Sequence, residues 1–190
     1  IGCTGVNPYF QLVKLPLSAT IAASALAGYL MQTPRLDLAS VIMSLSILLL
    51  ACGCAALNNY QDRQLDGCFT RTRRRPLPTG CISPERALAT ALILVISGLA
   101  GLLWQPYPVL LLGGFAVISY NGLYTPLKRL TVWAMLPGAI CGMLPPWMGW
   151  LAGGGDPLSL QIILVMSIFG VWQMPHFWLI LLTHEADYQR

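Results

Sequence analysis

The sequence carries very little charge. Only 9% of its 190 residues are Asp, Glu, Lys or Arg, whereas charged residues make up about a quarter of a typical soluble domain. Apolar residues account for 56% of the chain, and its mean hydropathy is +0.65. These values exclude an ordinary soluble domain and place the chain among integral membrane proteins. We therefore expect a lipid bilayer, and no nucleic acid, among its partners.

The sequence also lacks the alternation of polar and apolar residues that is typical of the strands of a membrane β-barrel. Its apolar residues come in long runs instead. Because lipid offers no hydrogen-bonding partner to an open backbone, these runs predict an all-α fold, a polytopic membrane helical bundle. Six transmembrane helices are expected, over residues 15–32, 38–60, 84–104, 107–124, 131–152 and 158–183.

Both ends of the sequence resemble cut ends. The first residue is Ile1 rather than Met, and Arg190 follows closely on the last apolar run. We expect residues 1–190 to be one incomplete domain of a longer protein, with further transmembrane helices after residue 190. The first span shows no evident cleavage site and is interpreted as a permanent helix rather than a signal peptide.

The basic residues lie almost entirely on one side of the expected spans. Three of the connections carry a single basic residue, Arg35. The other ten of the eleven are Lys14, Arg63, Arg71, Arg73, Arg74, Arg75, Arg86, Lys128, Arg129 and Arg190. The excess of positive charge predicts that this face is cytoplasmic, in the cell inner membrane of a bacterium or the mitochondrial inner membrane of a eukaryote. Cys68 and Cys81 belong to the same face, where disulfides are rare.

Acidic residues gather at the cytoplasmic end of the second span, in NNYQDRQLDG (residues 58–67). Asn58, Asp62 and Asp66 are four residues apart, so on a helix all three project from one face. One explanation is a solvated helix end. The alternative is a Mg²⁺ site, because carboxylate and amide oxygens are hard ligands that suit this ion together with substrate phosphates.

A run of basic residues follows these acids directly. Residues 61–75 contain five Arg and two Asp, a local net charge of +3. The run can serve membrane topology and lipid headgroups. Mg²⁺ ligands beside arginine side chains are, however, also what a diphosphate site requires, since the guanidinium group binds phosphate oxygens in pairs.

At this point the sequence resembles a known family. The stretch NNYQDRQLDGCFTRTRRRPLPTG resembles the first signature of the UbiA superfamily of intramembrane prenyltransferases, an N-x-x-x-D-x-x-x-D pattern that Asn58, Asp62 and Asp66 match. YTPLKRLT (residues 124–131) resembles the superfamily's conserved segment after the fourth helix, in which a basic residue binds diphosphate.

Two further segments are similar to the haem O synthase (protohaem IX farnesyltransferase) branch of that superfamily. They are PPWMGW (residues 145–150) and VWQMPHFW (residues 171–178). The superfamily's second acidic motif begins near the end of the sixth helix, where HEADYQR offers Asp187 as its first residue.

The resemblance implies a Mg²⁺-dependent transfer of farnesyl from farnesyl diphosphate to a vinyl group of haem B, which gives haem O and diphosphate. Mg²⁺ and the basic side chains would neutralise the leaving diphosphate, and aromatic rings such as Tyr60 and Tyr124 would stabilise the allylic cation. The residues assigned are Asp62, Asp66 and Lys128 for catalysis, Arg63, Arg71, Arg75, Lys128 and Arg129 for the diphosphate, His176, Trp172 and Gln173 for haem, and Asn58, Asp62, Asp66 and Asp187 for the metal.

Polar residues inside the last span allow two interpretations. Gln173 and His176 are costly in lipid unless they have partners. They can form a hydrogen bond between helices around Pro175, or His176 can hold haem B by iron ligation or a polar contact.

Two other functions remain open on the sequence. A UbiA-type enzyme that prenylates 4-hydroxybenzoate or another aromatic acceptor would share the acidic motif. A membrane transporter would need ionisable residues at mid-depth of its spans, whereas in this chain the charges collect on one face.

Overall fold

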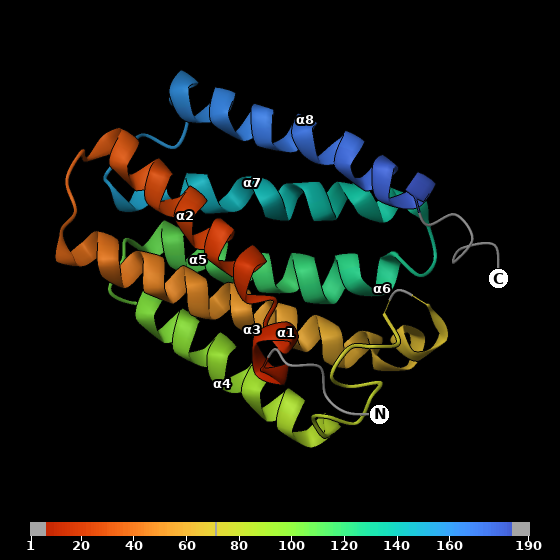
Figure 1. Cartoon of the computed structure of the whole chain (residues 1–190). Helices are drawn as coiled ribbons and strands as arrows, with labels where there is room; N and C mark the ends of the chain where they lie inside the picture. Colours follow the sequence, from red (N-terminus) through yellow and green to blue (C-terminus); the bar gives the residue numbers. More distant parts are fainter. Residues whose placement is uncertain (1–6, 71, 184–190) are drawn as a thin grey trace.

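The computed structural model describes residues 7–70 and 72–183, and all regular structure within them is helical. The all-α prediction is therefore confirmed. The helices pack side by side as one bundle (Figure 1). They are α1 (Pro8–Leu12), α2 (Leu15–Gln32), α3 (Leu38–Cys68), α4 (Pro84–Leu102), α5 (Tyr107–Val117), the π-helix η1 (Ile118–Tyr124), α6 (Thr125–Leu127), the 3₁₀-helix η2 (Val132–Ala134), α7 (Met135–Ala152) and α8 (Leu160–Thr183).

Helix α3 is the longest and determines where the charged residues lie. Its start is fixed by a capping box, in which the Asp37 carboxylate accepts from the Ser40 amide at 2.8 Å and Ser40 Oγ accepts from the Asp37 amide at 3.0 Å. Its 31 residues measure about 46 Å at 1.5 Å per residue, more than the ~30 Å of a bilayer core. The last turns of α3 therefore extend beyond the apolar run.

The expected span of residues 38–60 lies within this longer helix, as the helical spacing expected for Asn58, Asp62 and Asp66 requires. The helix continues to Cys68 because its polar last turns are buried against other segments rather than left in water. The start of α4 was predicted correctly: the Ser83 side chain caps the helix, Pro84 follows, and Glu85 lies in the first turn.

Several helices of the bundle are long enough to cross a membrane. Among the described residues three helical stretches are long and apolar enough to cross a bilayer, namely Leu38–Cys68, Pro84–Leu102 and Tyr107–Leu127, and a shorter apolar stretch covers Leu160–Pro175. The six expected runs are all helical, but the count of six spans is not confirmed. Large apolar side chains such as Leu92, Ile93 and Ile96 are exposed on the outside of α4, as lipid-facing residues are.

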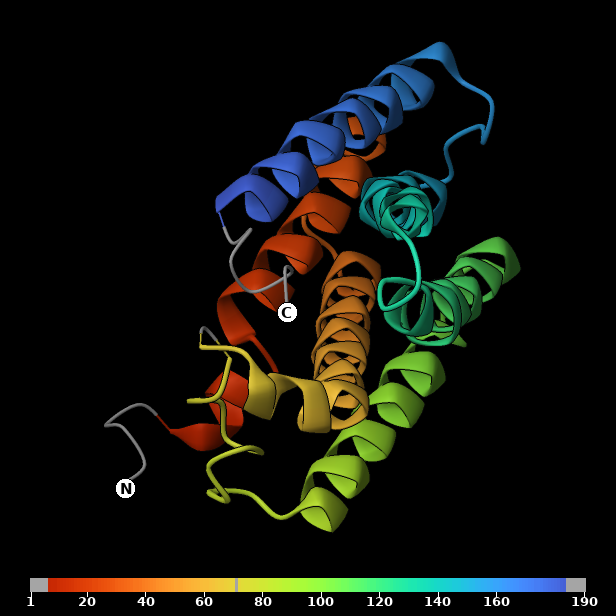
Figure 2. The same cartoon turned by 90° about the vertical axis from the view of Figure 1, so that its right-hand side faces the viewer.

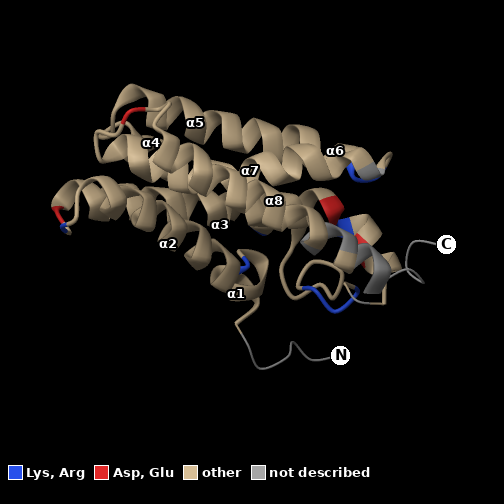
Figure 3. Cartoon of the chain, turned by 90° about the horizontal axis from the view of Figure 1, so that it is seen from above, with Lys and Arg blue, Asp and Glu red and all other residues tan. Residues whose placement is uncertain are grey.

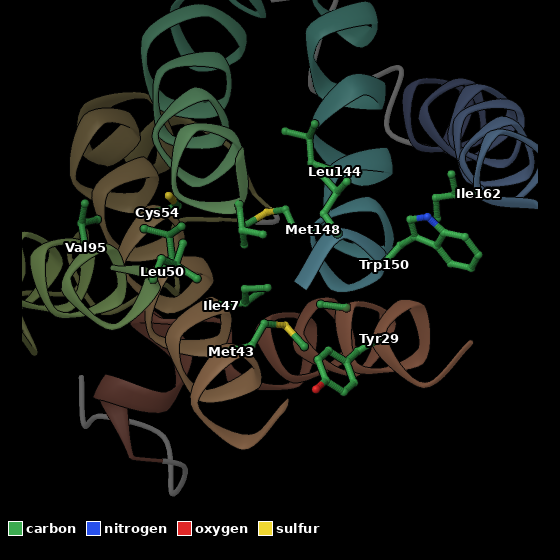
Figure 4. Packing of buried hydrophobic residues seen from close by; sticks show 14 residues of the cluster. Tyr29, Met43, Ile47, Leu50, Cys54, Val95, Leu144, Met148, Trp150 and Ile162 are labelled. Atoms are coloured by element: carbon green, nitrogen blue, oxygen red, sulfur yellow. The ribbon is translucent and has the colours of Figure 1, made fainter. Parts of the chain in front are cut away.

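The larger apolar core joins α2, α3, α4, α5, α7 and α8, and a second, smaller cluster packs α1, α3 and the start of α4. Met43, Ile47 and Leu50 of α3 face Leu144 and Met148 of α7 across this core (Figure 4). Because the core is purely apolar, it fixes the helices in place but supplies no chemistry.

Most of the charged residues lie toward the two ends of the bundle (Figure 3). Most of them surround the end of α3, where α1 and the connection 69–83 lie side by side (Figure 2). Cys81 in that connection is disulfide-bonded, contrary to the expectation for a cytoplasmic face, whereas Cys68 is an exposed free thiol.

Glycines allow α2 and α7 to approach closely. A Cβ atom added to Gly149 would overlap the backbone oxygen of Ala25, and one added to Gly28 would overlap that of Pro146. By contrast, a Cβ atom at Gly114, in α5, would meet nothing within 4 Å. The two glycines are therefore needed for packing, whereas Gly114 is not.

We predict opposite effects of two glycine-to-alanine substitutions. Gly149→Ala should lower the free energy of unfolding by about 1–3 kcal/mol, because two backbones must move apart. Gly114→Ala should leave it unchanged or raise it by up to about 1 kcal/mol, since alanine favours helix. Denaturant unfolding in detergent micelles measures both, and equal effects of the two substitutions would contradict this account of the packing.

Candidate active site

The site begins with three polar side chains on one face of α3. Asn58, Asp62 and Asp66 are 2%, 5% and 5% exposed. The Asn58 amide donates to Asp62 Oδ2 at 3.0 Å, so the first two members of the series are in contact. Two carboxylates are thus buried at the negative end of a helix dipole, a position that is unfavourable without positive partners.

Those partners come from two connections that are distant in sequence. After α6, Lys128 Nζ donates to Asp62 Oδ2, and Arg129 Nη2 donates to Asp62 Oδ1 at 3.0 Å. From the connection 69–83, Arg75 Nη1 donates to both Asp66 oxygens, at 2.8 and 2.9 Å. With Asn58, the structure therefore brings together six of the residues assigned from the sequence to metal, diphosphate and catalysis.

A fourth cation was not assigned to the site from the sequence. Lys14, which precedes α2, donates to Asn58 Oδ1 at 3.1 Å. Burial, followed by the positive charges of Arg75 and Lys128, lowers the pKa of the Lys14 ammonium to about 8. The group is therefore still mostly charged at neutral pH.

A π-helix places the segment that carries Lys128. In such a turn an amide bonds to the carbonyl five residues back, as the Thr125 amide does to Tyr120. Pro126 has no amide hydrogen, so the carbonyl of Asn121 lacks this partner and accepts instead from the Gln61 side chain of α3 at 3.0 Å. The proline and the π-turn together create a link to α3.

Further hydrogen bonds connect the π-helix with the acidic face. The buried Asn121 side chain donates to the Cys54 carbonyl at 3.0 Å. Thr125 Oγ1 accepts from the Asn58 amide at 3.0 Å and donates to the Tyr120 carbonyl at 2.8 Å. Sequence analysis missed these groups, whose only signal was a few polar residues inside an apolar run. The helix expected to stop at residue 124 in fact continues through Pro126 to Leu127.

Aromatic rings lie beside the charged groups. Tyr120 and Tyr124 are stacked with their ring centroids 5.4 Å apart. Lys128 Nζ lies 5.4 Å from the Tyr124 centroid, and the Arg63 guanidinium lies 4.2 Å from that of Tyr60. Both rings already interact with a cation. Arg63, assigned to the diphosphate, otherwise donates to the Tyr60 carbonyl at 2.8 Å, so its observed contacts are not with the carboxylates.

The residues assigned to haem are less well defined. Trp172 of α8 is 71% exposed, while the Gln173 side chain lies against the backbone of Gly142 in α7. His176 belongs to α8, but its side chain lies outside the described part of the structure. Arg71 and Asp187 also lie outside the described residues.

The donor set fits a hard cation that a substrate helps to bind. In the described part of the chain, no cluster of three or more His, Cys, Asp or Glu side chains is placed to hold a metal. The face of α3 instead offers two carboxylates and one amide oxygen. Mg²⁺ typically binds to one or two carboxylates and completes its coordination with water and substrate phosphates. Asn58, Asp62 and Asp66 therefore suit Mg²⁺ bound together with a diphosphate.

Comparison with known proteins identifies the family. The model of the UbiA prenyltransferase family matches residues 17–190. The chain belongs to this family. The resemblance stated from the sequence motifs is thereby confirmed.

Several curated relatives of this UbiA-family chain carry the name protoheme IX farnesyltransferase. The protein from Nitratidesulfovibrio vulgaris (strain DP4) is 39% identical over 170 residues, which are 89% of this chain and 59% of that protein. The protein from Geobacter sulfurreducens is 41% identical over 88% of this chain and 62% of its own length. The chain thus spans about three fifths of the length of these relatives.

Solved structures show the same fold at low sequence identity. A digeranylgeranylglyceryl phosphate synthase matches 96% of this chain and 65% of its own with a TM-score of 0.78 and 18% identity. A UbiA homologue from Archaeoglobus fulgidus, bound to DMAPP and Mg²⁺, matches 90% and 62% with a TM-score of 0.73 and 18% identity. The bundle of this chain is therefore a UbiA-type membrane fold.

The Arg75–Asp66 pair allows a test of the site's electrostatics. We expect Arg75→Met to lower the free energy of unfolding by about 1–3 kcal/mol, because it leaves Asp66 buried without its partner. The effect is moderated because the Arg75 side chain is 27% exposed. Adding Asp66→Asn should restore part of the loss. Denaturant titrations of the single and double variants measure this, with Arg74→Met as the exposed control from the same connection. Additive losses in the double variant would contradict the pairing.

Proposed function

We propose that the protein to which this chain belongs is a Mg²⁺-dependent protohaem IX farnesyltransferase that converts haem B and farnesyl diphosphate into haem O and diphosphate. The observation that carries the proposal is the convergence of Asp62 and Asp66 with Arg75, Lys128 and Arg129 at one end of the bundle. The names of the curated relatives support the farnesyl and haem substrates. The solved homologue bound to DMAPP and Mg²⁺ supports the metal.

The site's charges suit the departure of a diphosphate. Asn58, Asp62 and Asp66 would hold Mg²⁺, which when bound supplies positive charge against the leaving oxygens. Lys128, Arg129 and Arg75 then exchange carboxylate oxygens for diphosphate oxygens, with further contacts proposed for Arg63 and Arg71. Their fixed position offsets the charge that develops as the bond from carbon to diphosphate oxygen breaks.

The carbon chemistry takes place beside aromatic rings. The breaking bond leaves its electron pair on diphosphate and a positive charge on the allylic carbons, which the face of Tyr124 stabilises. The haem vinyl group donates its electrons to form the new carbon–carbon bond. Water then adds to the resulting cation and loses a proton, which gives the hydroxyethylfarnesyl group. The surrounding apolar bundle keeps water from the allylic cation before this step.

Haem binding is proposed for α8. His176 would contact haem B by iron ligation or a polar contact, with further contacts proposed for Gln173, which lies against α7, and for the exposed Trp172. Asp187 is proposed as a further metal ligand. The rival acceptor, 4-hydroxybenzoate or another aromatic compound, needs the same diphosphate site but no haem contact.

The function is tested by the haem content of cells that express the intact protein. Mass spectrometry should detect haem O with the wild-type protein, and Asp62→Asn or Asp66→Asn should lower its amount by about 100-fold or more, because each removes a charge that holds the leaving group's metal. Asp156→Asn, at an exposed carboxylate of the opposite connection, should have no effect. Near wild-type haem O in the Asp62→Asn cells would refute the metal site, and a prenylated 4-hydroxybenzoate in place of haem O would favour the rival enzyme.

We also propose that the site faces the cytoplasm, as the distribution of basic residues predicts. A membrane-impermeant maleimide should label the exposed thiol of Cys68 in inverted membrane vesicles but not in intact spheroplasts. A cysteine introduced at the exposed Leu158, in a Cys68→Ser background, should give the reverse pattern. The test is needed because a disulfide at Cys81 is unusual for a reducing compartment. Labelling of Cys68 from outside would overturn the proposed orientation.

A further inference from the structure

Lys14 has a backbone conformation that lysine rarely adopts. Its φ and ψ are 48° and 50°, and it is the only residue other than glycine with positive φ in the described part of the chain. The left-handed conformation is unfavourable for a residue with a side chain. Such strain persists where the surrounding structure holds it, and it clusters at functional sites.

The neighbours of Lys14 hold the chain in this conformation from both sides. Before it, the carbonyl of Leu12 accepts from the Asn59 side chain of α3 at 2.7 Å, and Leu12 is fully buried. After it, the hydroxyl of the buried Ser18 donates to the Val13 carbonyl at 2.9 Å. The sharp turn between α1 and α2 therefore points the Lys14 side chain at the acidic face of α3.

Lys14 differs from the other cations of the site in its partner. Arg75, Lys128 and Arg129 each pair with a carboxylate. Among the described residues Lys14 forms no ion pair, and its ammonium donates to the neutral amide oxygen of Asn58. Four cations thus surround two carboxylates, an excess of two positive charges in a half-buried place. An excess of this sign suits a multiply charged anion.

We propose that Lys14 is a further diphosphate-binding residue of this site. When the diphosphate and its metal bind, the ammonium leaves Asn58 Oδ1, the oxygen assigned to the metal, and donates to a diphosphate oxygen. The strained turn then has a function, because it brings a cation from the N-terminal segment to a substrate held mainly by α3 and α6. The inference rests on the proposed function only in taking the anion to be a diphosphate.

Binding of inorganic pyrophosphate tests the role of Lys14 without any acceptor. The intact protein in detergent is titrated with pyrophosphate at saturating Mg²⁺, and the dissociation constant is measured by calorimetry. Three variants separate the contributions: Lys14→Met removes the charge, Lys14→Arg keeps it, and Lys14→Gly removes it while relieving the backbone. Arg35→Met, at the opposite end of α2, is the matched control.

We expect Lys14→Met to raise the dissociation constant of pyrophosphate by about tenfold or more, the loss typical of one charge-assisted hydrogen bond. Lys14→Arg should stay within about threefold of wild type, and Arg35→Met should bind as wild type does. Lys14→Gly should lose affinity as Lys14→Met does, yet unfold at the same or a higher temperature, since glycine accepts positive φ without strain. Loss of binding without loss of stability is not what a purely structural lysine would show.

Three outcomes are contrary to the proposal. In the first, Lys14→Met binds pyrophosphate with wild-type affinity and only its Mg²⁺ requirement changes. Lys14 would then position Asn58 and would not bind the diphosphate. Weak binding accompanied by a lower unfolding temperature in all three variants would make it structural. Failure of the wild-type protein to bind pyrophosphate would also overturn it. A wild-type protein that binds pyrophosphate but makes no haem O would refute the proposed function and leave the role of Lys14 intact.

Discussion

The architecture of the site depends on the neutralisation of two buried carboxylates at the end of one apolar helix. Burial and the helix dipole both disfavour negative charge at Asp62 and Asp66. The cations that pair with them follow their carboxylates in the sequence by as few as nine and as many as 67 residues. Two connections, and Lys14 from the N-terminal side, therefore have to fold onto the same end of the bundle. This folding positions the charged residues assigned to the site, within the described chain, with the exception of Arg63.

The π-helix allows this arrangement inside an apolar span. Backbone groups that lose their regular partners in lipid must find others. Beside Pro126 the Asn121 carbonyl accepts from the Gln61 side chain, and the Tyr120 carbonyl, which accepts from the Thr125 amide, accepts from the Thr125 hydroxyl as well. The bond from Gln61 also attaches this helix to α3 just before Lys128 and Arg129. The irregular backbone therefore supports the site, as π-turns at functional sites often do.

The sequence was sufficient where the decisive physics is local. Four-residue spacing places Asn58, Asp62 and Asp66 on one face whatever the rest of the chain does, and Ser83 caps its helix from one turn away. The sequence was insufficient where residues distant in the chain determine a pairing or a backbone conformation. Local spacing does not reveal that Asp66 pairs with Arg75, or that the chain makes a left-handed turn at Lys14 beside the bond from Asn59 to Leu12. In an apolar helix such as α8, composition alone also does not show that Trp172 faces outward.

The central claim is that the carboxylates hold the site's cations in readiness for a metal and a diphosphate. A structure of the intact protein with Mg²⁺ and a non-hydrolysable farnesyl diphosphate analogue tests it most directly. The account predicts Asp62 and Asp66 oxygens at about 2.1 Å from Mg²⁺, or hydrogen-bonded to a water that is itself bound to Mg²⁺, with Lys128, Arg129 and Arg75 turned to diphosphate oxygens. Ion pairs that stay as they are now, with the diphosphate bound elsewhere, would contradict it.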